Sequence, residues 1–191
     1  YKLSKLMKKD MFIAVLSMHN KNAKGEIQLT RDVDELNAAL GFLGIEKANI
    51  MIGELSGQIF DSSNQEIREC LISLRNKIKP TLVFFPSSSD VHQDHDALAK
   101  EAYRIFRNEN CFGYEIIRSS LHFFPNLYIK MNKEEIEMKS AAVLMYASQK
   151  SESAGYYFSK EAITSLSQYR GIQVGVEYAE AFECYKTILN D

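Results

Sequence analysis

The segment from Asp90 to Asp96 concentrates the side chains best suited to chemistry: Asp90, His92, Asp94, His95 and Asp96. Imidazole nitrogens and carboxylate oxygens are ligands that zinc prefers, and a catalytic zinc keeps one position open for water. The pKa of that water falls to about 7, so hydroxide becomes available at neutral pH. A carboxylate beside a histidine also fixes the tautomer of the ring. The spacing therefore indicates a metal or acid–base site, and a polar loop that caps a helix is the alternative.

A zinc site needs more ligands than this segment supplies, and the other candidates are weaker. His19 follows an apolar run and is interpreted as a loop histidine, although it is expected at the ligand-binding edge of the sheet. His122, within Leu-His-Phe-Phe-Pro, is interpreted as a partly buried structural histidine. Asp61 is a further carboxylate that no spacing singles out. By its residues alone, the sequence presents half of a metal site.

The segments before this site predict alternating strands and helices. Three continuous apolar runs are typical of strands buried on both faces: 11–17, 48–52 and 81–85. Apolar residues at helical spacing predict one helix capped by Thr30 and closed by Gly44, and a second capped by Ser62 or Ser63 and ended by Pro80. Such βαβ units build parallel sheets, and ligands bind beyond the carboxyl ends of the strands. The third strand therefore leads directly into the Asp90–Asp96 segment.

The rest of the chain continues the same pattern. The expected elements are a helix over 97–107, strands over 114–119 and 127–131, and helices over 133–149 and 159–169. We predict an α/β fold with an open, mostly parallel sheet, helices on both faces, and a single domain over 1–191. Residues 1–9 resemble the second half of a helix, so the first strand is expected to be missing. A free amphipathic helix is the alternative.

Composition excludes several classes of protein. The 191 residues carry a net charge of −2, so no global basic surface is available for nucleic acid. The apolar runs are far shorter than the ~20 residues that span a bilayer. Three widely spaced cysteines without a CxxC pair, together with the lack of a signal-peptide pattern, predict reduced thiols in a cytoplasmic protein.

The stretch Pro86-Ser-Ser-Ser-Asp-Val-His-Gln-Asp-His-Asp-Ala97 resembles the second motif of the PIG-L/LmbE family of zinc-dependent N-acetylglucosamine deacetylases. Further segments resemble the family along the chain: 31–44, 79–86, 125–129, Lys139, 146–149, 170–175 and 178–182. The resemblance implies a Rossmann-like fold and a zinc ion held by two histidines and one aspartate. It implies that zinc-bound water attacks an acetamide carbonyl and releases acetate and an amine.

The resemblance also implies roles for individual residues. His95 is expected to bind zinc, and His92 is expected to steady the oxyanion or protonate the leaving amine. Asp94 would orient His92, and Asp90 would support the site from behind. The family's first motif, His-Pro-Asp-Asp-Glu, is absent, so we expect an N-terminally truncated piece of an enzyme. If the chain were complete, a non-catalytic protein that binds a sugar or a partner would be the better hypothesis.

The substrate can be described only by class. The resemblance implies an N-acetylated sugar conjugate, and Arg31, Arg170 or Lys139 could contact an anionic substituent on it. Surface or structural ion pairs are the alternative for each of these cations. A metal-dependent phosphoesterase would need a second set of carboxylates, which the sequence does not show. A homo-oligomer is compatible with the last 40 residues but has no specific signal.

Overall fold

The computed structural model describes residues 2–3, 10–21, 24, 26–29, 31–57, 64–149 and 156–189. Its α-helices in these ranges include α2 (Val33–Phe42), α3 (Asn64–Ile78), α4 (Gln93–Ile105), α5 (Lys133–Leu144) and α6 (Lys160–Ile172). Its strands include β1 (Ile13–Val15), β2 (His19–Lys21), β3 (Ile27–Leu29), β4 (Ile50–Ile52), β5 (Ser56–Gly57), β6 (Leu82–Pro86), β7 (Asn110–Tyr114), β8 (Leu127–Met131) and β9 (Tyr178–Lys186). Short 3-10 turns lie at Lys47–Asn49 and Ala147–Gln149.

The chain divides into two compact units. The first unit takes Tyr1–Glu54 and Lys130–Glu180, and the second unit takes Leu55–Ile129 and Ala181–Asp191. The prediction of a single domain over 1–191 stays a prediction. None of the helices that the structure describes is long and apolar enough to span a membrane.

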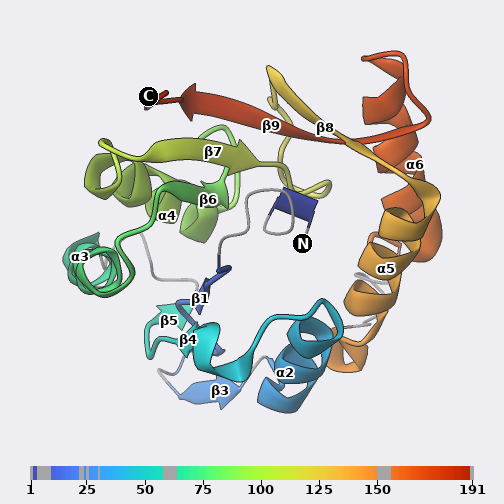
Figure 1. Ribbon diagram of the computed structural model, residues 1–191. Helices are drawn as coiled ribbons and strands as arrows, with labels where there is room; N and C mark the ends of the chain where they lie inside the picture. Colours follow the sequence, from blue (N-terminus) through green and yellow to red (C-terminus); the bar gives the residue numbers. More distant parts are fainter. Residues whose placement is uncertain are drawn as a thin grey trace. The chain divides into compact units, whose positions relative to one another are not determined.

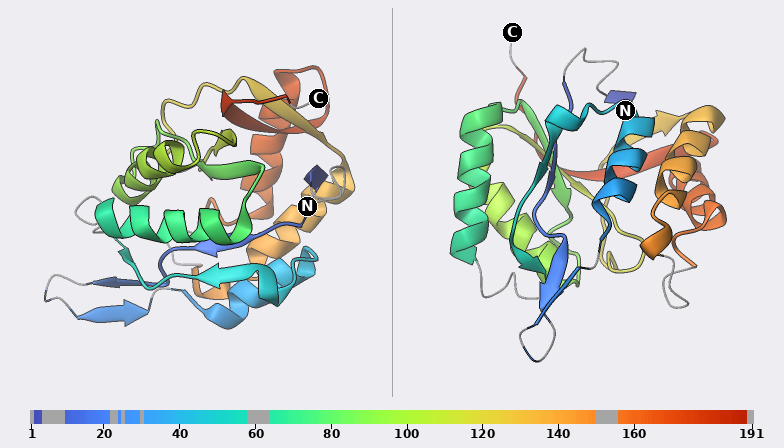
Figure 2. Two further views of the ribbon diagram at one scale, coloured as in Figure 1. Left: turned by 60° about the vertical axis from the view of Figure 1, so that its left-hand side comes forward. Right: turned by 90° about the horizontal axis from the view of Figure 1, so that it is seen from below.

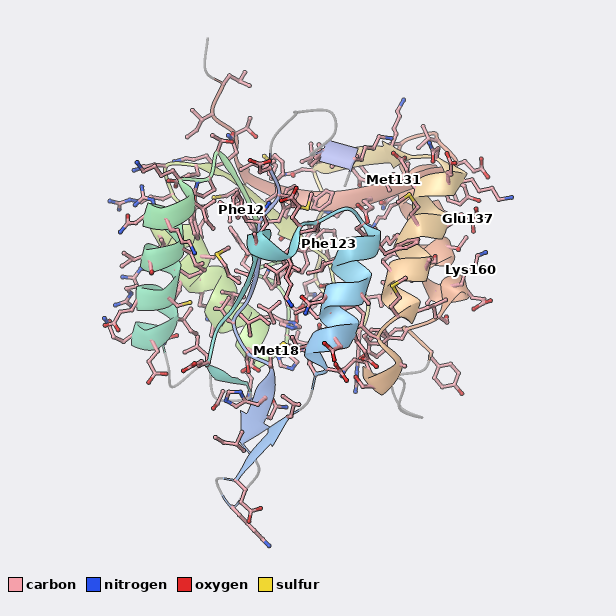
Figure 3. All side chains as sticks on the ribbon, turned by 60° about the horizontal axis from the view of Figure 1, so that its bottom comes forward. Phe12, Met18, Phe123, Met131, Glu137 and Lys160 are labelled. Carbon is pink, nitrogen blue, oxygen red and sulfur yellow. The ribbon has the colours of Figure 1, made fainter. Side chains whose placement is uncertain are left out.

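In the first unit, β1 and β4 form a parallel pair with Ile13 opposite Ile50 (Figure 1). Strands β2 and β3 form an antiparallel pair with His19 opposite Leu29, so the interpretation of His19 as a loop histidine is wrong. Helix α5 packs against both α2 and α6. Glu137 on α5 and Lys160 on α6 are exposed (Figure 3).

The ends of these helices follow capping chemistry. Asp32 is the N-cap of α2, and its carboxylate accepts from the backbone N–H of Asp34 at 2.7 Å. The expected cap, Thr30, lies outside the described residues. Gly44 closes the helix with a φ of +77°, which a side chain would disfavour. The predicted glycine stop is therefore confirmed, and the N-terminal cap is an aspartate, whose acceptor oxygen serves as well as a hydroxyl.

Helix α6 meets its own continuation closely at Gly171. A Cβ at this position would lie 2.6 Å from the carbonyl oxygen of Val176 and 2.7 Å from that of Glu177. Gly41 in α2 differs, because nothing lies within 4 Å of a Cβ built there. Only the first of these two helical glycines is required by packing.

A mixed sheet has the strand order β6–β7–β9–β8, and the second unit holds β6 and β7 together with residues 127–129 of β8 and 181–186 of β9. Strand β7 pairs in parallel with β6 and antiparallel with β9, where Gly113 faces Glu183. Helices α3 and α4 lie side by side, and α4 packs on β6 (Figure 2). Glu101 on α4 accepts from Arg68 on α3 through both carboxylate oxygens, at 2.9 and 3.1 Å.

The predicted α/β class is confirmed, and the predicted parallel character holds only in part. The pairs β1–β4 and β6–β7 are parallel, but β9 makes the larger sheet mixed. The strand expected over 114–119 is wrong, because the strand there is β7 at Asn110–Tyr114 and a turn follows it. The helix after the site begins at Gln93, four residues before the predicted Ala97. Capping by His92 explains the earlier start.

Candidate functional site

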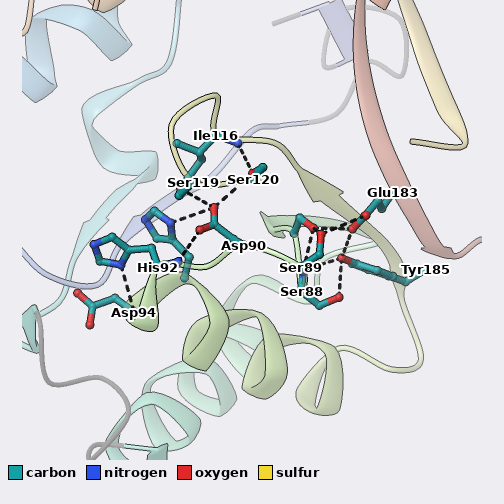
Figure 4. A network of polar contacts seen from close by, with 12 residues as sticks. Ser88, Ser89, Asp90, His92, Asp94, Ile116, Ser119, Ser120, Glu183 and Tyr185 are labelled. Carbon is teal, nitrogen blue, oxygen red and sulfur yellow. Dashed lines mark hydrogen bonds and ion pairs between the residues drawn. The ribbon is translucent and has the colours of Figure 1, made fainter. Parts of the chain in front are cut away.

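Asp90 is the centre of the candidate site. Strand β6 ends at Pro86, a tight turn follows, and the Asp90 carboxylate lies fully buried just before α4. Its Oδ1 accepts from the backbone N–H of His92 at 2.8 Å (Figure 4). Its Oδ2 accepts from the hydroxyls of Ser119 at 2.9 Å and Ser120 at 3.3 Å. Hydrogen bonds on both oxygens offset the cost of burying this charge.

These bonds join two loops of the second unit. The backbone N–H of Val91 also donates to the carbonyl of Ser119 at 3.0 Å. The turn that carries Asp90 is thereby held against the turn over 116–120. Ser119 and Ser120 were missed by sequence reasoning, because two adjacent serines in a loop carry no signal of their own.

His92 caps helix α4 with its side chain. Its Nδ1 accepts from the backbone N–H of Asp94 at 3.2 Å. A nitrogen that accepts carries no proton, so the neutral ring holds its proton on Nε2. Because His92 is an exposed residue, its Nε2–H can donate to an oxygen that becomes negative. The contact uses the backbone of Asp94, and the orienting role expected of its carboxylate stays a prediction.

His95 lies one helical turn further and stacks on His92, with ring centroids 4.3 Å apart. Its Nδ1 is 3.2 Å from Asp90 Oδ2, although no described residue gives this buried atom a well-aligned hydrogen bond. Burial lowers the pKa of His95, and the charge of Asp90 opposes that shift. A neutral ring whose Nδ1 faces a carboxylate leaves Nε2 with a lone pair for a metal or a proton.

The described residues do not complete a zinc site. Among them, no group of three or more His, Cys, Asp or Glu side chains is arranged to hold a metal ion. His92 and His95 supply two imidazoles at most, whereas catalytic zinc takes three protein ligands and a water. The described donor set is therefore only part of what zinc needs, and the assignment of His95 as a ligand stays a prediction.

The remaining sequence candidates have other surroundings. His19 begins β2, and Asp61 lies outside the described residues. His122 is exposed, so the expectation that it is partly buried is wrong. Nothing along Leu-His-Phe-Phe-Pro reveals that this apolar stretch forms an open loop.

The cations expected to bind substrate lie in the first unit. Arg31 donates to the carbonyl of Ser17 at 3.0 Å, and Arg170 is buried and donates to Gln173 at 3.0 Å. Lys139 forms an ion pair with Glu180. Each therefore has a structural partner, and a role in substrate binding stays a prediction for Arg31 and Arg170.

No protein-family profile matches the chain, and no curated protein matches it in sequence. Solved structures do match. The conserved protein TT1542 from Thermus thermophilus is 23% identical, with 99% of this chain and 87% of that chain covered and a TM-score of 0.72. An N,N'-diacetylchitobiose deacetylase from Pyrococcus horikoshii is 17% identical over 78% of this chain and 61% of its own, with a TM-score of 0.64.

A third match carries a different activity. GalB, the 4-carboxy-2-hydroxymuconate hydratase from Pseudomonas putida KT2440, is 17% identical over 99% of this chain and 89% of its own, with a TM-score of 0.72. The chain shares the fold of these proteins. At such identities the likeness extends to the fold alone, and the reaction has to be argued from the site.

Proposed function

We propose that this protein is a hydrolase of the deacetylase type that removes an acetyl group from an N-acetylated sugar conjugate with the help of zinc. The observation that carries the proposal is the pair His92 and His95 on the first turn of α4, anchored by buried Asp90. The site follows strand β6, where folds of this kind bind ligands. The solved structures of this fold include a chitobiose deacetylase.

The geometry suits attack of water on an amide. A tetrahedral intermediate places negative charge on the former carbonyl oxygen, and the Nε2–H of His92 is the donor available to stabilise it. His95 would contribute one imidazole to the metal. A bound zinc ion would supply a water of lowered pKa as the nucleophile.

Three unbridged cysteines support a reducing compartment, the cytoplasm.

Acetate release tests the reaction. The full-length protein is incubated with N,N'-diacetylchitobiose and zinc, and acetate and free amine are quantified. We expect both products in equal amounts, and a loss of roughly 10²- to 10³-fold in turnover for His92→Asn. His122→Asn is the matched control, because it removes an exposed histidine from another loop of the same unit. Acetate at the same rate from His92→Asn would contradict the role of His92.

Metal retention tests the two histidines separately. We expect His95→Ala to lose zinc after dialysis and His92→Ala to keep it, as measured by metal content per chain. The reverse result would exchange the two roles.

The principal alternatives predict different products. Binding of the sugar in calorimetry without acetate release would favour a non-catalytic sugar-binding protein. Water addition to 4-carboxy-2-hydroxymuconate without acetate release from any N-acetyl sugar would favour a hydratase, the activity of GalB. Either outcome would overturn the deacetylase proposal.

A further inference from the structure

Glu183 on β9 is a buried carboxylate outside the cluster of Asp90, His92 and His95. Its Oε2 accepts from the hydroxyls of Ser87 and Tyr185, both at 2.6 Å. Its Oε1 accepts from the backbone N–H of Phe124 at 3.0 Å and lies 3.5 Å from the hydroxyl of Ser89. These partners are neutral, so the carboxylate charge is held by hydrogen bonds alone.

Tyr185 extends the same contact to the next residue of the turn. Its hydroxyl accepts from the backbone N–H of Ser88 at 2.8 Å and lies 3.1 Å from Ser88 Oγ (Figure 4). Its ring stacks on Phe85 of β6, with centroids 5.6 Å apart and planes 9° apart. Burial, and then Glu183, raise the pKa of Tyr185, so the phenol keeps its proton and remains a donor.

The backbone of β7 leaves room for this ring. A Cβ on Gly113 would lie 2.7 Å from the Tyr185 hydroxyl and 2.9 Å from its ring. Because Gly113 faces Glu183 across the β7–β9 pair, the absence of a side chain there lets both residues reach the turn from one strand.

A backbone hydrogen bond connects the Ser87–Ser89 turn to Asp90. The carbonyl of Ser87 accepts from the backbone N–H of Asp90 at 3.1 Å, and Asp90 in turn accepts from the N–H of His92. We propose that Glu183 and Tyr185 are positioning residues, which fix the Ser87–Ser89 turn so that Asp90 presents His92 and His95 in productive orientation. The effect on turnover rests on the proposed function, whereas the effect on histidine geometry does not.

The two residues share one task from adjacent sides. Glu183 forms hydrogen bonds with the hydroxyls of Ser87 and Ser89. Tyr185 forms hydrogen bonds with the backbone N–H and the hydroxyl of Ser88. A buried carboxylate contributes less to stability than an apolar side chain of similar size, because removing its charge from water is costly. An apolar residue could not hold the hydroxyls of Ser87 and Ser89, as Glu183 does.

The test removes the contacts without removing the packing. Tyr185→Phe deletes the hydroxyl and keeps the ring on Phe85. Glu183→Gln keeps the shape but leaves one acceptor oxygen in place of two, so either the two hydroxyl bonds at Oε2 or the bond from the backbone N–H of Phe124 at Oε1 is lost. Tyr103→Phe is the matched control, because this exposed α4 ring meets Tyr185 by its edge at 5.8 Å. Each protein is labelled with ¹⁵N on histidine, and the imidazole resonances are recorded beside thermal unfolding and acetate release.

We expect both variants to fold and to lose the single-tautomer ¹⁵N signal of His92 Nδ1 through broadening or averaging. Turnover should fall about 10- to 100-fold with KM within about twofold, the size typical for supporting contacts of a site. Tyr103→Phe should match the wild type in both readouts. Unchanged His92 and His95 resonances in folded Tyr185→Phe or Glu183→Gln would overturn the proposal.

Failure of the proposed function gives a different result. If the wild type releases no acetate, the imidazole resonances still report the geometry, and their change or constancy decides the positioning role. If Tyr185→Phe does not fold, the isosteric Glu183→Gln decides it.

Discussion

His92 and Asp94 are joined by one hydrogen bond, in which the backbone N–H of Asp94 donates to His92 Nδ1 at 3.2 Å. One side chain therefore caps helix α4 and also presents an imidazole at the edge of the sheet. The two interpretations of the Asp90–Asp96 segment, a capping loop and a chemical site, are compatible, because the capping atom is Nδ1 and the outward atom is Nε2.

Substitution of His92 separates these two roles. Asparagine is a strong N-cap, so His92→Asn should keep the midpoint of urea unfolding near that of the wild type while acetate release falls roughly 10²- to 10³-fold. Alanine cannot cap, so His92→Ala should lose about 1 kcal/mol of unfolding free energy as well as activity. Equal stability of both variants would show that the Nδ1 contact contributes nothing to the helix.

The Arg68–Glu101 contact gives the second unit a stability that depends on pH. The hydrogen bond from Arg68 is the main cause that lowers the pKa of Glu101. A carboxyl whose pKa is lower in the folded state stabilises above its unfolded pKa, about 4.3, and loses that effect as pH falls through the folded value. We expect Glu101→Gln to lower Tm by roughly 2–5 °C at pH 7.

The comparison over pH checks the sign. The gap in Tm between wild type and Glu101→Gln should be constant from pH 8 to about 5 and should narrow below about pH 4. A gap that widens on acidification would contradict the assignment. Arg75→Gln is the control variant. It removes another ion pair made by α3, that of Arg75 with Glu109, and leaves Glu101 in place.

Cys111 should be the least reactive of the three thiols. It is fully buried, its Sγ donates to the carbonyl of Phe106, and burial raises its pKa to about 11. At pH 8 only about one part in a thousand is thiolate. Iodoacetamide should therefore modify Cys184 in the native protein well before Cys111, as followed by peptide mass spectrometry.

The pH dependence gives a further check on Cys111. Its alkylation rate in the folded protein should rise about tenfold per pH unit up to about pH 11, since the thiolate fraction rises by that factor. Rapid modification of Cys111 at pH 8, at the rate seen in urea, would contradict its burial.

The two helical glycines should respond in opposite directions to alanine. Gly171→Ala places a Cβ against two carbonyl oxygens, so we expect a loss of about 1–3 kcal/mol in unfolding free energy. Gly41→Ala meets no neighbour and should gain about 0.4–1 kcal/mol, because alanine restricts the unfolded chain. A gain for Gly171→Ala, measured by urea unfolding, would show that the contact with Val176 is not tight.

The part of the fold read from the sequence is the part with local signals. The apolar run before Pro86 predicts β6, and the polar segment after it predicts the turn at Asp90. Gly44 predicts the end of α2. Each of these signals lies within a few residues of the feature that it predicts. Strand β8 at Leu127–Met131 also lies where an apolar run predicts it.

The part that was missed depends on distant partners. Strand β9 mixes Glu183 and Lys186 with apolar residues and is specified by pairing with β7. Strand β7 was misplaced because Ile116 and Ile117 carry more strand propensity than the chain at Gly113. The hydroxyls on Asp90 come from residues 29 and 30 positions away, which no spacing within the site reveals.

The bond between Ser87 and Glu183 spans 96 positions of the chain. During synthesis at about 5–20 residues per second, the Ser87–Ser89 turn leaves the ribosome roughly 5–20 s before the strand that holds it. For that interval α4 can already be capped by His92, because that contact is local, while Asp90 lacks the support that arrives with β9. On a ribosome stalled before residue 183, the local cap of α4 by His92 can form, whereas the hydrogen bonds of Glu183 and Tyr185 to the Ser87–Ser89 turn cannot.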